Sequence, residues 1–234
     1  MKLKIKIFAD GANLEEMKKA YREGTVRGFT TNPTLMRKAG IADYEEFCRK
    51  VLAVISDLPI SLEVFSDDIE EMARQAKKIS SWGSNVYVKI PVTNTRGEKT
   101  SRIIHNLSHE GVKLNVTAIL TVDQVKWIAE ALAENTPAIV SVFAGRIADT
   151  GQDPLPVMQE SLNILKNRPL AELLWASPRE VLNVVQADRM GCHIITITND
   201  LLKKIPVLGT TLADMSLQTV KMFYEDAVAA KYHL

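Results

Sequence analysis

The chain has 234 residues, 46% of them hydrophobic, a length that suits one large α/β barrel or two small domains. Its 29 basic and 28 acidic residues give a net charge of +1 without a basic stripe or acidic tail, so nothing suggests nucleic acid or an anionic membrane as a partner. We find no signal-peptide or membrane-spanning run, and we expect a cytoplasmic protein in which two isolated cysteines, Cys48 and Cys192, are buried thiols.

Short runs rich in β-forming residues recur along the chain, separated by helix-like stretches. The runs cover residues 4–10, 28–33, 60–65, 86–92, 113–119, 138–143, 172–177 and 193–198. Alternating strands and helices predict parallel strands with right-handed crossovers, and eight such units predict a closed (β/α)8 TIM barrel. The alternative is a doubly wound open sheet, but its GxGxxG turn is absent, as is a Walker-type GxxxxGK.

Amphipathic stretches between the runs predict the outer helices. They cover residues 13–23, 43–56, 67–80, 99–110, 122–134 and 154–166. The last segment, 208–234, is predicted to be one long helix with more apolar side chains than a terminal helix needs. We therefore divide the chain into a barrel domain, 1–207, and a C-terminal helix, 208–234. This helix packs either on a neighbouring subunit or on its own barrel.

A polar residue stands near the carboxyl end of every run. These residues are Asp10, Asn32, Glu63, Lys89, Asn115 with Thr117, Ser141, Ser177, and Thr196 with Thr198. The carboxyl ends of the strands form the face where barrel enzymes have their active sites. Because an unpaired buried polar group costs about 1–3 kcal/mol, a barrel without a function would favour apolar residues there. The pattern predicts a functional site at this mouth.

Lys89 is the most unusual of these residues, because it stands inside the apolar run VYVKIPV. A buried ammonium group is costly unless it is paired or deprotonated. The neutral amine is the form that attacks a carbonyl carbon to give a Schiff base. The alternative is a structural lysine paired with Asp10 or Glu63.

The segment Ser177-Pro178-Arg179 is predicted to open a helix, with Ser177 as its N-cap and Pro178 at the first helical position. Together with Arg146 from the loop after the sixth run, this helix start would also bind an anion. Barrel phosphate sites favour the loops after the late strands. His105 and His109 are spaced as in HExxH, but the Glu and a third ligand are missing, so we expect surface residues and no metal.

These motifs, taken together, resemble the transaldolase family, and the resemblance covers nearly the whole chain. FADGAN, TTNP, SLEVF, VKIPVT, NVTAI, SVFAGRI and WASPR are similar to the family's motifs on strands one to seven, in that order. The resemblance implies an enzyme that acts on sugar phosphates through a Schiff base, with no metal and no organic cofactor. It also implies a homo-oligomer, with a decamer of two pentameric rings as the first expectation.

The resemblance further implies a role for each matching residue. Lys89 would be the nucleophile and Asp10 the acid and base for carbon–carbon cleavage. Glu63 and Thr117 would hold the water that relays protons. The substrate-binding residues would be Asn32, Asn115, Ser141 and Phe143 around the dihydroxyacetone unit, and Arg146, Ser177 and Arg179 around the phosphate.

Two positions favour a transaldolase of the pentose phosphate pathway type, which transfers a dihydroxyacetone unit from a ketose phosphate to an aldose phosphate. Glu63 and Phe143 stand where the related fructose-6-phosphate aldolases typically have Gln and Tyr, and Phe cannot donate a proton. Gly11 and Pro178 depart from the family pattern. Pro178 would alter the shape of the anion site, so a modified ketose, such as a sulfonated one, is a second possible substrate. An aldolase, which is a lyase, and a non-catalytic barrel that binds sugar phosphates are the competing functions.

Overall fold

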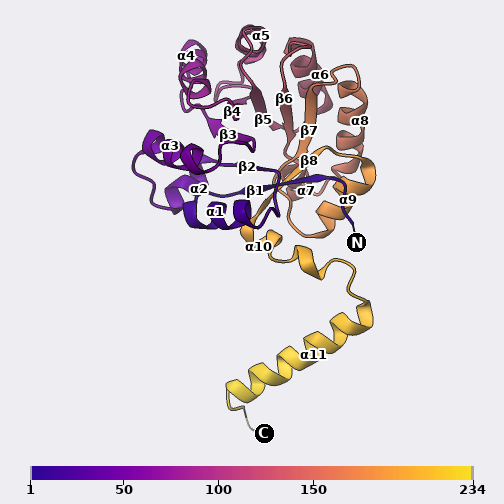
Figure 1. The fold of residues 1–234 in the computed structure, drawn as a ribbon. Helices are drawn as coiled ribbons and strands as arrows, with labels where there is room; N and C mark the ends of the chain where they lie inside the picture. The colour runs from indigo at the N-terminus through magenta and orange to yellow at the C-terminus, as the bar shows by residue number, and fades with distance from the viewer. Residues whose placement is uncertain (1, 233–234) are drawn as a thin grey trace.

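Eight parallel strands close into a barrel in sequence order, which confirms the predicted (β/α)8 architecture and excludes the open sheet (Figure 1). The computed structural model describes residues 2–232. The strands are β1 (Lys6–Asp10), β2 (Gly28–Thr30), β3 (Ile60–Glu63), β4 (Val86–Pro91), β5 (Leu114–Ile119), β6 (Ala138–Val142), β7 (Ala171–Trp175) and β8 (Ile194–Thr198). β8 pairs with β1 over five positions, and this pairing closes the ring.

The predicted outer helices are all present, each slightly shorter than its sequence pattern. The helices around the barrel are α1 (Leu14–Arg22), α2 (Pro33–Lys38), α3 (Tyr44–Val54), α4 (Ile69–Ser80), α5 (Ser101–His109), α6 (Val122–Ala131), α7 (Ala144–Asp149), α8 (Leu155–Leu165), α9 (Leu182–Met190) and α10 (Asn199–Leu202). Side chains of Asp43, Asp68 and Thr121 cap α3, α4 and α6 by accepting a backbone N–H bond from the first turn. The short helices α2 and α7 had no clear sequence signal.

The floor of the barrel is apolar and closed. Phe8, Ile139, Leu174 and Ile194 pack together inside the ring, well below the strand ends. Gly28 makes this possible, because a Cβ on Gly28 would lie 2.5 Å from Cζ of the Phe8 ring. A packed floor leaves the polar ends of the strands as a one-sided opening.

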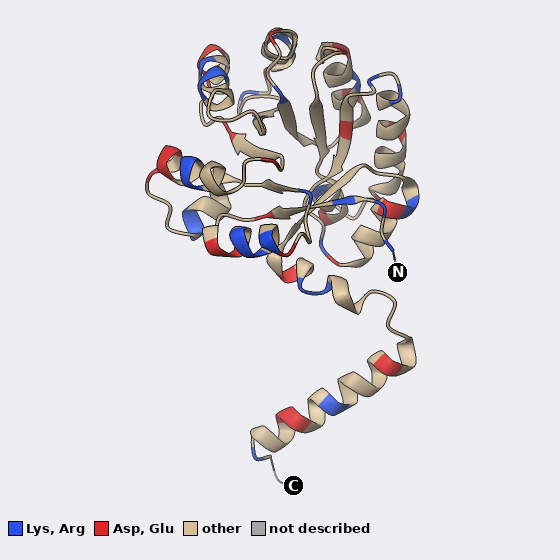
Figure 2. Ribbon diagram, viewed as in Figure 1, with Lys and Arg blue, Asp and Glu red and all other residues tan. Residues whose placement is uncertain are grey.

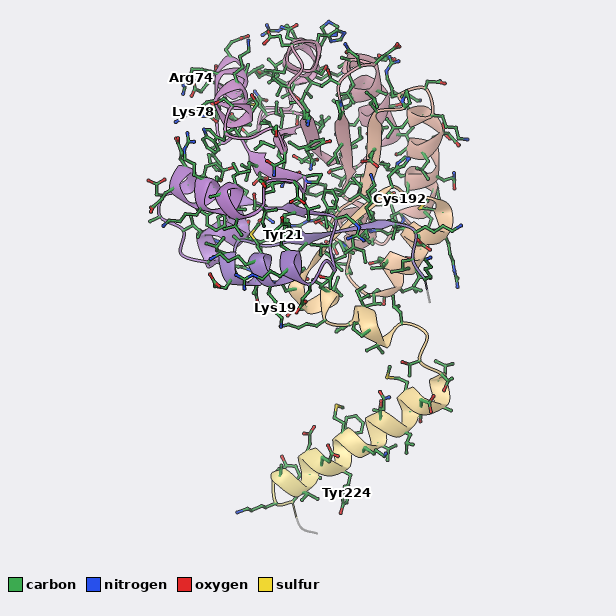
Figure 3. The ribbon with its side chains drawn as sticks, viewed as in Figure 1. Lys19, Tyr21, Arg74, Lys78, Cys192 and Tyr224 are labelled. Atoms are coloured by element: carbon green, nitrogen blue, oxygen red, sulfur yellow. The ribbon has the colours of Figure 1, made fainter. Side chains whose placement is uncertain are left out.

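The C-terminal helix α11 (Leu212–Ala229) projects away from the barrel, after a turn of 3₁₀ helix, η1 (Ile205–Val207) (Figure 1). The sequence predicted that this helix begins at residue 208, which was wrong: it begins at Leu212. Gly209 has a left-handed φ of 92°, and the Thr211 side chain caps the helix through the Asp214 N–H. No described residue of α11 is buried, and Figure 3 shows its side chains, including Tyr224, standing clear of the barrel. The helix therefore does not pack on its own barrel.

Charged side chains of both signs are interspersed over the outer helices (Figure 2). Exposed ion pairs at helical spacing, such as Arg49–Glu45 and Lys50–Glu46 on α3, account for part of this mixture. Across residues 2–232, none of the helices combines the length and the apolar character that a membrane crossing requires.

Candidate active site

The carboxyl ends of the strands surround a cavity of about 480 Å³. All eleven residues that the sequence singled out for catalysis or substrate binding line it: Asp10, Asn32, Glu63, Lys89, Asn115, Thr117, Ser141, Phe143, Arg146, Ser177 and Arg179. They come from seven strands or the segments that follow them. The structure thus brings these side chains to one place, as the inward alternation of strand residues predicts.

Lys89 and Glu63 form a buried ion pair at the centre of this cavity. They are direct neighbours in the β3–β4 register, and Lys89 Nζ lies 2.9 Å from Glu63 Oε1. Nζ also donates a hydrogen bond to the carbonyl oxygen of Thr31. Lys89 is 7% exposed, so the lysine is both buried and paired. The pairing that the structural alternative requires is therefore present.

Glu63 has a second oxygen that this pairing leaves unused. Oε2 is buried, and no group among residues 2–232 gives it a hydrogen bond. Burial raises the pKa of the Glu63 carboxyl, the charge of Lys89 opposes that rise, and the nearby Asp10 carboxyl adds to it. A buried acceptor without a partner, next to a lysine in a cavity, is typical of a site that binds water or a substrate hydroxyl.

Asp10 lies across the cavity and is held by two side chains. Its Oδ1 accepts a hydrogen bond from Thr30 Oγ1 at 2.7 Å, and its Oδ2 accepts a longer one from Asn32 Nδ2 at 3.4 Å. Thr30 and Thr196 share a further hydrogen bond of 2.6 Å between their hydroxyls. Burial raises the pKa of Asp10, while Lys89, Thr30 and Asn32 act in the opposite direction. Asp10 is thus a fixed, desolvated carboxyl that can exchange a proton.

A second buried chain of hydrogen bonds orients Asn115. Its Nδ2 donates to Ser61 Oγ at 2.9 Å, and its Oδ1 accepts from Ser141 Oγ at 2.6 Å. Thr117 follows on the same strand, just before a register shift at which Ala118 has a left-handed φ of 59°. A bulge of this kind changes the direction of the side chains beside it, and bulges are common next to active sites.

The predicted helix start at Ser177 was wrong. Ser177 has a left-handed φ of 56°, and α9 begins only at Leu182. The backbone N–H groups of Arg179 and Glu180 both donate to the Asn183 side chain, so neither is free to bind an anion. The physical reason is a close approach of Gly145, where a Cβ would lie 1.5 Å from the Ser177 carbonyl oxygen.

Two arginines nevertheless meet at this end of the cavity. Arg146 lies on α7 rather than in a loop, and Arg179 lies in the segment before α9. Both face Asp149: Arg179 makes two hydrogen bonds with its carboxylate, and Arg146 Nη1 lies 3.9 Å from Oδ2. The Arg179 guanidinium holds the pKa of Asp149 below its usual range. Two partly exposed guanidinium groups beside a cavity form a suitable site for a phosphate group.

The two aspartates should titrate with opposite effects on stability. Because burial raises the Asp10 pKa, the folded state binds the proton more tightly, and wild-type stability falls as pH rises from the unfolded pKa to the folded one. In Asp10→Asn this titration is lost. Over this pH range we expect the unfolding free energy of Asp10→Asn to rise relative to that of wild type. The rise should be about 1.4 kcal/mol for each unit by which folding raises the Asp10 pKa.

Urea unfolding at intervals from pH 3 to pH 8 measures this difference. Asp149→Asn is the control, because the Asp149 pKa is lowered. The Asp149 carboxylate stabilises the fold above its unfolded pKa, and this stabilisation is lost as pH falls. The unfolding free energy of Asp149→Asn should therefore fall relative to that of wild type as pH rises. The same pH trend in both variants would contradict the prediction.

Comparison with known proteins agrees with this geometry. A family model described as Transaldolase/Fructose-6-phosphate aldolase matches residues 7–233. The chain belongs to this family. It is 39% identical over 194 residues to a Dehalococcoides mccartyi protein named "Probable transaldolase", and the match covers 82% of this chain and 86% of that protein. It is 36% identical over 202 residues to "Probable transaldolase 2" of Listeria monocytogenes, with coverages of 86% and 88%.

Solved structures show the same fold at much lower sequence identity. A Burkholderia cenocepacia protein described as a lyase/mutase superposes with a TM-score of 0.61 over 87% of this chain and 79% of its own, at 11% identity. At that identity the likeness concerns the barrel fold alone. The transaldolase/fructose-6-phosphate aldolase family is shown by sequence, through the family model and the relatives.

Sequence reasoning missed several contacts and side chains in the cavity of this family member. Thr30 donates to Asp10 and is bonded in turn to Thr196, a residue that the sequence placed at the mouth without a role. The inward positions of both threonines, on β2 and β8, were the signal that could have found this contact. Lys38 lines the rim from the end of α2, a helix without a sequence signal. Asn32 also has a structural task, because its Oδ1 caps α2 by accepting from the Leu35 N–H at 2.9 Å.

The expectations for the two histidines and the two cysteines agree with the structure. His105 and His109 are exposed on α5, with ring centroids 4.0 Å apart. No three His, Cys, Asp or Glu side chains within residues 2–232 are grouped to hold a metal ion. Cys48 and Cys192 are free and buried, and burial raises both thiol pKa values to about 12, which keeps them unreactive.

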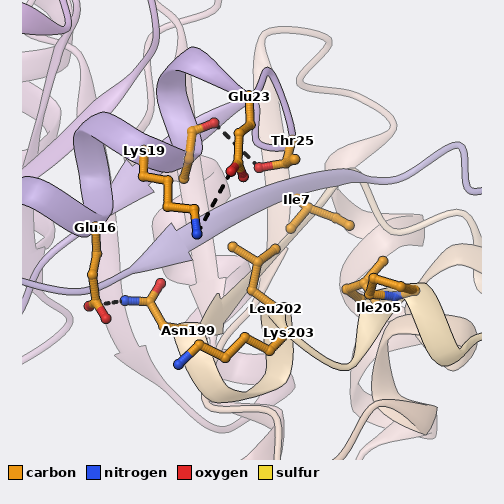
Figure 4. A pocket seen from close by; sticks show the side chains of 11 residues that line it. Ile7, Glu16, Lys19, Glu23, Thr25, Asn199, Leu202, Lys203 and Ile205 are labelled. Atoms are coloured by element: carbon orange, nitrogen blue, oxygen red, sulfur yellow. Dashed lines mark hydrogen bonds and ion pairs between the residues drawn. The ribbon is translucent and has the colours of Figure 1, made fainter.

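A second cavity, of about 490 Å³, lies outside the barrel between α1 and α10 (Figure 4). Its polar side chains are largely paired with one another: Glu16 accepts a hydrogen bond from Asn199, and Lys19 faces Glu23 at 3.9 Å. Ile7 and Leu202 provide apolar walls. Among residues 2–232, its lining includes no buried lysine and no unpaired buried acid, whereas the barrel mouth has both, so the barrel mouth is the better candidate for the active site.

Proposed function

We propose that this family member is a transaldolase that uses Lys89 to form a Schiff base with a ketose phosphate. The observation that supports this most is the buried Lys89–Glu63 pair, 2.9 Å apart, with the Asp10 carboxyl in the same cavity. A structural ion pair alone would not need a cavity, an unpaired Glu63 oxygen and a second carboxyl, Asp10, of raised pKa.

Schiff-base formation needs a neutral amine and a nearby proton acceptor. Glu63 takes a proton from Lys89, since its oxygen is in contact with Nζ and burial raises its pKa. Nζ then attacks C2 of the ketose, and the carbonyl oxygen takes a proton to give a carbinolamine. A water held between Glu63 and Thr117 relays the next proton, so that the hydroxyl leaves as water and the iminium forms.

Carbon–carbon cleavage then depends on Asp10. Its carboxylate takes the proton of the C4 hydroxyl, the C3–C4 bond breaks, and its electron pair moves into the iminium to give an enamine. The aldehyde product leaves. C3 of the enamine attacks the carbonyl carbon of the acceptor aldose, whose oxygen receives the proton back from Asp10. Water then hydrolyses the iminium and releases the new ketose, so no redox cofactor is needed.

The remaining residues of the cavity bind and orient the sugar. Asn32, Asn115 and Ser141 offer polar groups for the hydroxyls of the dihydroxyacetone unit. Arg146, Ser177 and Arg179 bind the phosphate, or the sulfonate of a modified ketose, at the other end. Both anions suit guanidinium groups, because each presents several acceptor oxygens.

Phe143 favours transfer over simple cleavage. It lines the cavity beside the floor of the barrel and carries no proton to donate. An enamine that is not protonated stays on Lys89 until the acceptor arrives. The alternative, an aldolase of the fructose-6-phosphate type, requires a proton donor for the enamine that Phe143 cannot supply.

The test measures glyceraldehyde 3-phosphate release from fructose 6-phosphate, with and without erythrose 4-phosphate. Release that requires the acceptor supports a transaldolase of the pentose phosphate pathway type. Equal release in both conditions makes the protein an aldolase and contradicts the interpretation of Phe143. Absence of any aldehyde product from phosphorylated, sulfonated and free ketoses would contradict both activities and favour a non-catalytic barrel.

We also propose that the chain forms a homo-oligomer through α11, with a decamer of two pentamers as the first model. The helix lies apart from residues 1–207 and exposes large apolar side chains along its length: Leu212, Leu217, Val220, Met222, Phe223 and Val228. An apolar surface of this extent is costly in water, and a second copy of the chain can cover it.

Removing residues 211–234 should therefore reduce the assembly. We expect light scattering of the full chain to give a multiple of the 26.0 kDa monomer mass, and the shortened chain to give a smaller species. Phe223→Asp tests the same surface with a single charge, and Tyr232→Asp is its control near the end of the chain. A monomeric full chain would contradict the proposal.

A further inference from the structure

Strand β2 is too short to pair with the whole of β3. It has three residues, and its register with β3 covers only Phe29–Ile60 and Thr30–Ser61. One more bond, from the Thr31 N–H to the Ser61 carbonyl at 3.3 Å, ends this ladder. The backbone of Glu63 therefore faces the β2 side with no strand beside it.

The direction of the Glu63 backbone follows from the hydrogen bonds of its neighbours. The Ile60 and Val64 N–H groups donate toward β4, to Asn85 and Lys89. In a parallel strand successive residues alternate, so the N–H and C=O of Glu63 point the other way, toward β2. A buried backbone N–H without a partner costs as much as a lost hydrogen bond.

Tyr44, the first residue of α3, fills the place of the missing strand. Its hydroxyl accepts a hydrogen bond from the Glu63 N–H at 2.7 Å and donates one to the Glu63 carbonyl at 3.1 Å. Its ring packs edge-on against Phe65, with centroids 4.4 Å apart, and lies 6.1 Å from the Trp82 ring. One hydroxyl thus satisfies both backbone groups of the residue whose carboxylate contacts Lys89.

We propose that Tyr44 is a positioning residue for the reaction: its hydroxyl substitutes for a strand partner of Glu63 and holds the Glu63 carboxylate against Lys89. This inference rests on the proposed role of Glu63. Tyr44 does not line the catalytic cavity, so it acts through Glu63 and not on the substrate.

Other observations fit this role. Burial raises the pKa of Tyr44 far above its usual value, so the hydroxyl keeps the proton that it donates to the Glu63 carbonyl. The charged groups that act on the Glu63 carboxyl are Lys89 from β4 and Asp10 from β1, and Cys48 lies beside the Tyr44 ring on α3. None of these groups takes the place of the hydroxyl on the Glu63 backbone.

The test is Tyr44→Phe, which removes one oxygen and keeps the ring. Loss of the Glu63 anchor should misplace its carboxylate, so we expect kcat to fall about 10- to 100-fold, with KM within about twofold of wild type. Tyr21→Phe is the matched control: its hydroxyl donates a hydrogen bond to the Asp57 side chain at 2.7 Å, and the residue is half-buried on α1, outside the catalytic cavity (Figure 3).

A double-variant comparison separates positioning from a general structural effect. In a Glu63→Ala background there is no carboxylate to position, so adding Tyr44→Phe should change kcat by less than about twofold. A full additional loss in that background would overturn the inference, as would a Tyr44→Phe enzyme whose kcat matches that of Tyr21→Phe.

A readout without turnover keeps this test independent of the proposed function. The rate at which acetic anhydride acylates Lys89, followed by mass spectrometry from pH 6 to pH 10, reports how firmly the Glu63 anion stabilises the ammonium form. We expect acylation at lower pH in Tyr44→Phe than in Tyr21→Phe, and identical profiles would overturn the inference. If wild type has no activity on any ketose, the proposed function fails while this comparison still stands.

A second variant serves if Tyr44→Phe does not fold. Phe65→Leu keeps the hydroxyl but removes the ring that packs against Tyr44, at a residue that is 52% exposed. We expect Lys89 acylation to shift toward lower pH in this variant too, by less than in Tyr44→Phe. An unchanged profile in Phe65→Leu would then overturn the inference.

Discussion

Replacing Lys89 with methionine is expected to lower transaldolase activity by on the order of 10⁴- to 10⁶-fold, the loss that removal of a covalent nucleophile produces. The methionine side chain has nearly the same length and packs in the same space, but it cannot form a Schiff base. Borohydride with fructose 6-phosphate should trap a covalent adduct on the wild-type chain and none on the variant.

Lys6→Met is the matched control for this experiment. Lys6 is also a lysine on an inward position of a barrel strand, and it pairs with Glu172 at 2.7 Å. That pair lies at the opposite end of the barrel, outside the catalytic cavity. We expect Lys6→Met to keep both the activity and the adduct. An adduct that persists in Lys89→Met would contradict the proposed nucleophile.

Lys89→Met should also change how the stability of the protein depends on pH. Without the ammonium group, the carboxyls of Glu63 and Asp10 remain buried, and the opposing effect of Lys89 on their raised pKa values is lost. The cost of ionising them then grows as pH rises. The unfolding free energy of Lys89→Met should therefore lie further below that of wild type at pH 8 than at pH 5.

Much of the site could be predicted from sequence because a strand alternates its side chains with a period of two. Once eight strands are recognised, the inward positions of β1, β3, β4 and β5 follow directly, and they bring Asp10, Glu63, Lys89 and Asn115 together. Closure of the barrel then brings residues more than one hundred positions apart into one cavity. This part of the prediction needs only local pattern and the geometry of the fold.

The rest depends on contacts that no local pattern contains. Ser177 and Pro178 read as a helix start, but the backbone of Gly145, 32 positions earlier, occupies the space that a standard turn would use. The pairing of Arg179 with Asp149 is likewise a contact between residues that are distant in sequence. The Tyr44 hydroxyl on Glu63 depends on the shortness of β2, which the run at 28–33 did not show.

Two segments at the mouth of the barrel have a strained backbone. Among non-glycine residues that the structure describes, Ala118 and Ser177 have left-handed φ values at the mouth of the barrel. Such conformations cost about 1–3 kcal/mol each and persist where surrounding contacts enforce them. They flank Thr117 and Arg179, so the strain lies where the proposed proton relay and phosphate site need side chains in set directions.

Gly145→Ala should be the most damaging small substitution outside the catalytic residues. Its Cβ would lie 1.5 Å from the Ser177 carbonyl oxygen and 2.6 Å from the carbonyl carbon, both backbone atoms that cannot turn away. The segments that carry Arg146 and Arg179 must therefore separate. We expect a loss of about 3 kcal/mol in unfolding free energy, the upper range for overpacking, measured by urea unfolding.

The same substitution should separate phosphate binding from lysine chemistry. With the two arginines apart, KM for fructose 6-phosphate should rise about tenfold or more, since a phosphate held by two guanidinium groups loses one of them. Dihydroxyacetone carries no phosphate, so its borohydride adduct on Lys89 should form nearly as in wild type in the folded fraction.

Gly11→Ala is the control for the stability measurement. Gly11 has no left-handed φ, and a Cβ there would meet only Asn199 Nδ2 at 3.9 Å, an ordinary contact. We expect its unfolding free energy to stay within about 1 kcal/mol of wild type. If Gly145→Ala were equally mild, the two segments could move apart freely. The fixed spacing of Arg146 and Arg179, on which the phosphate site depends, would then not come from this backbone contact.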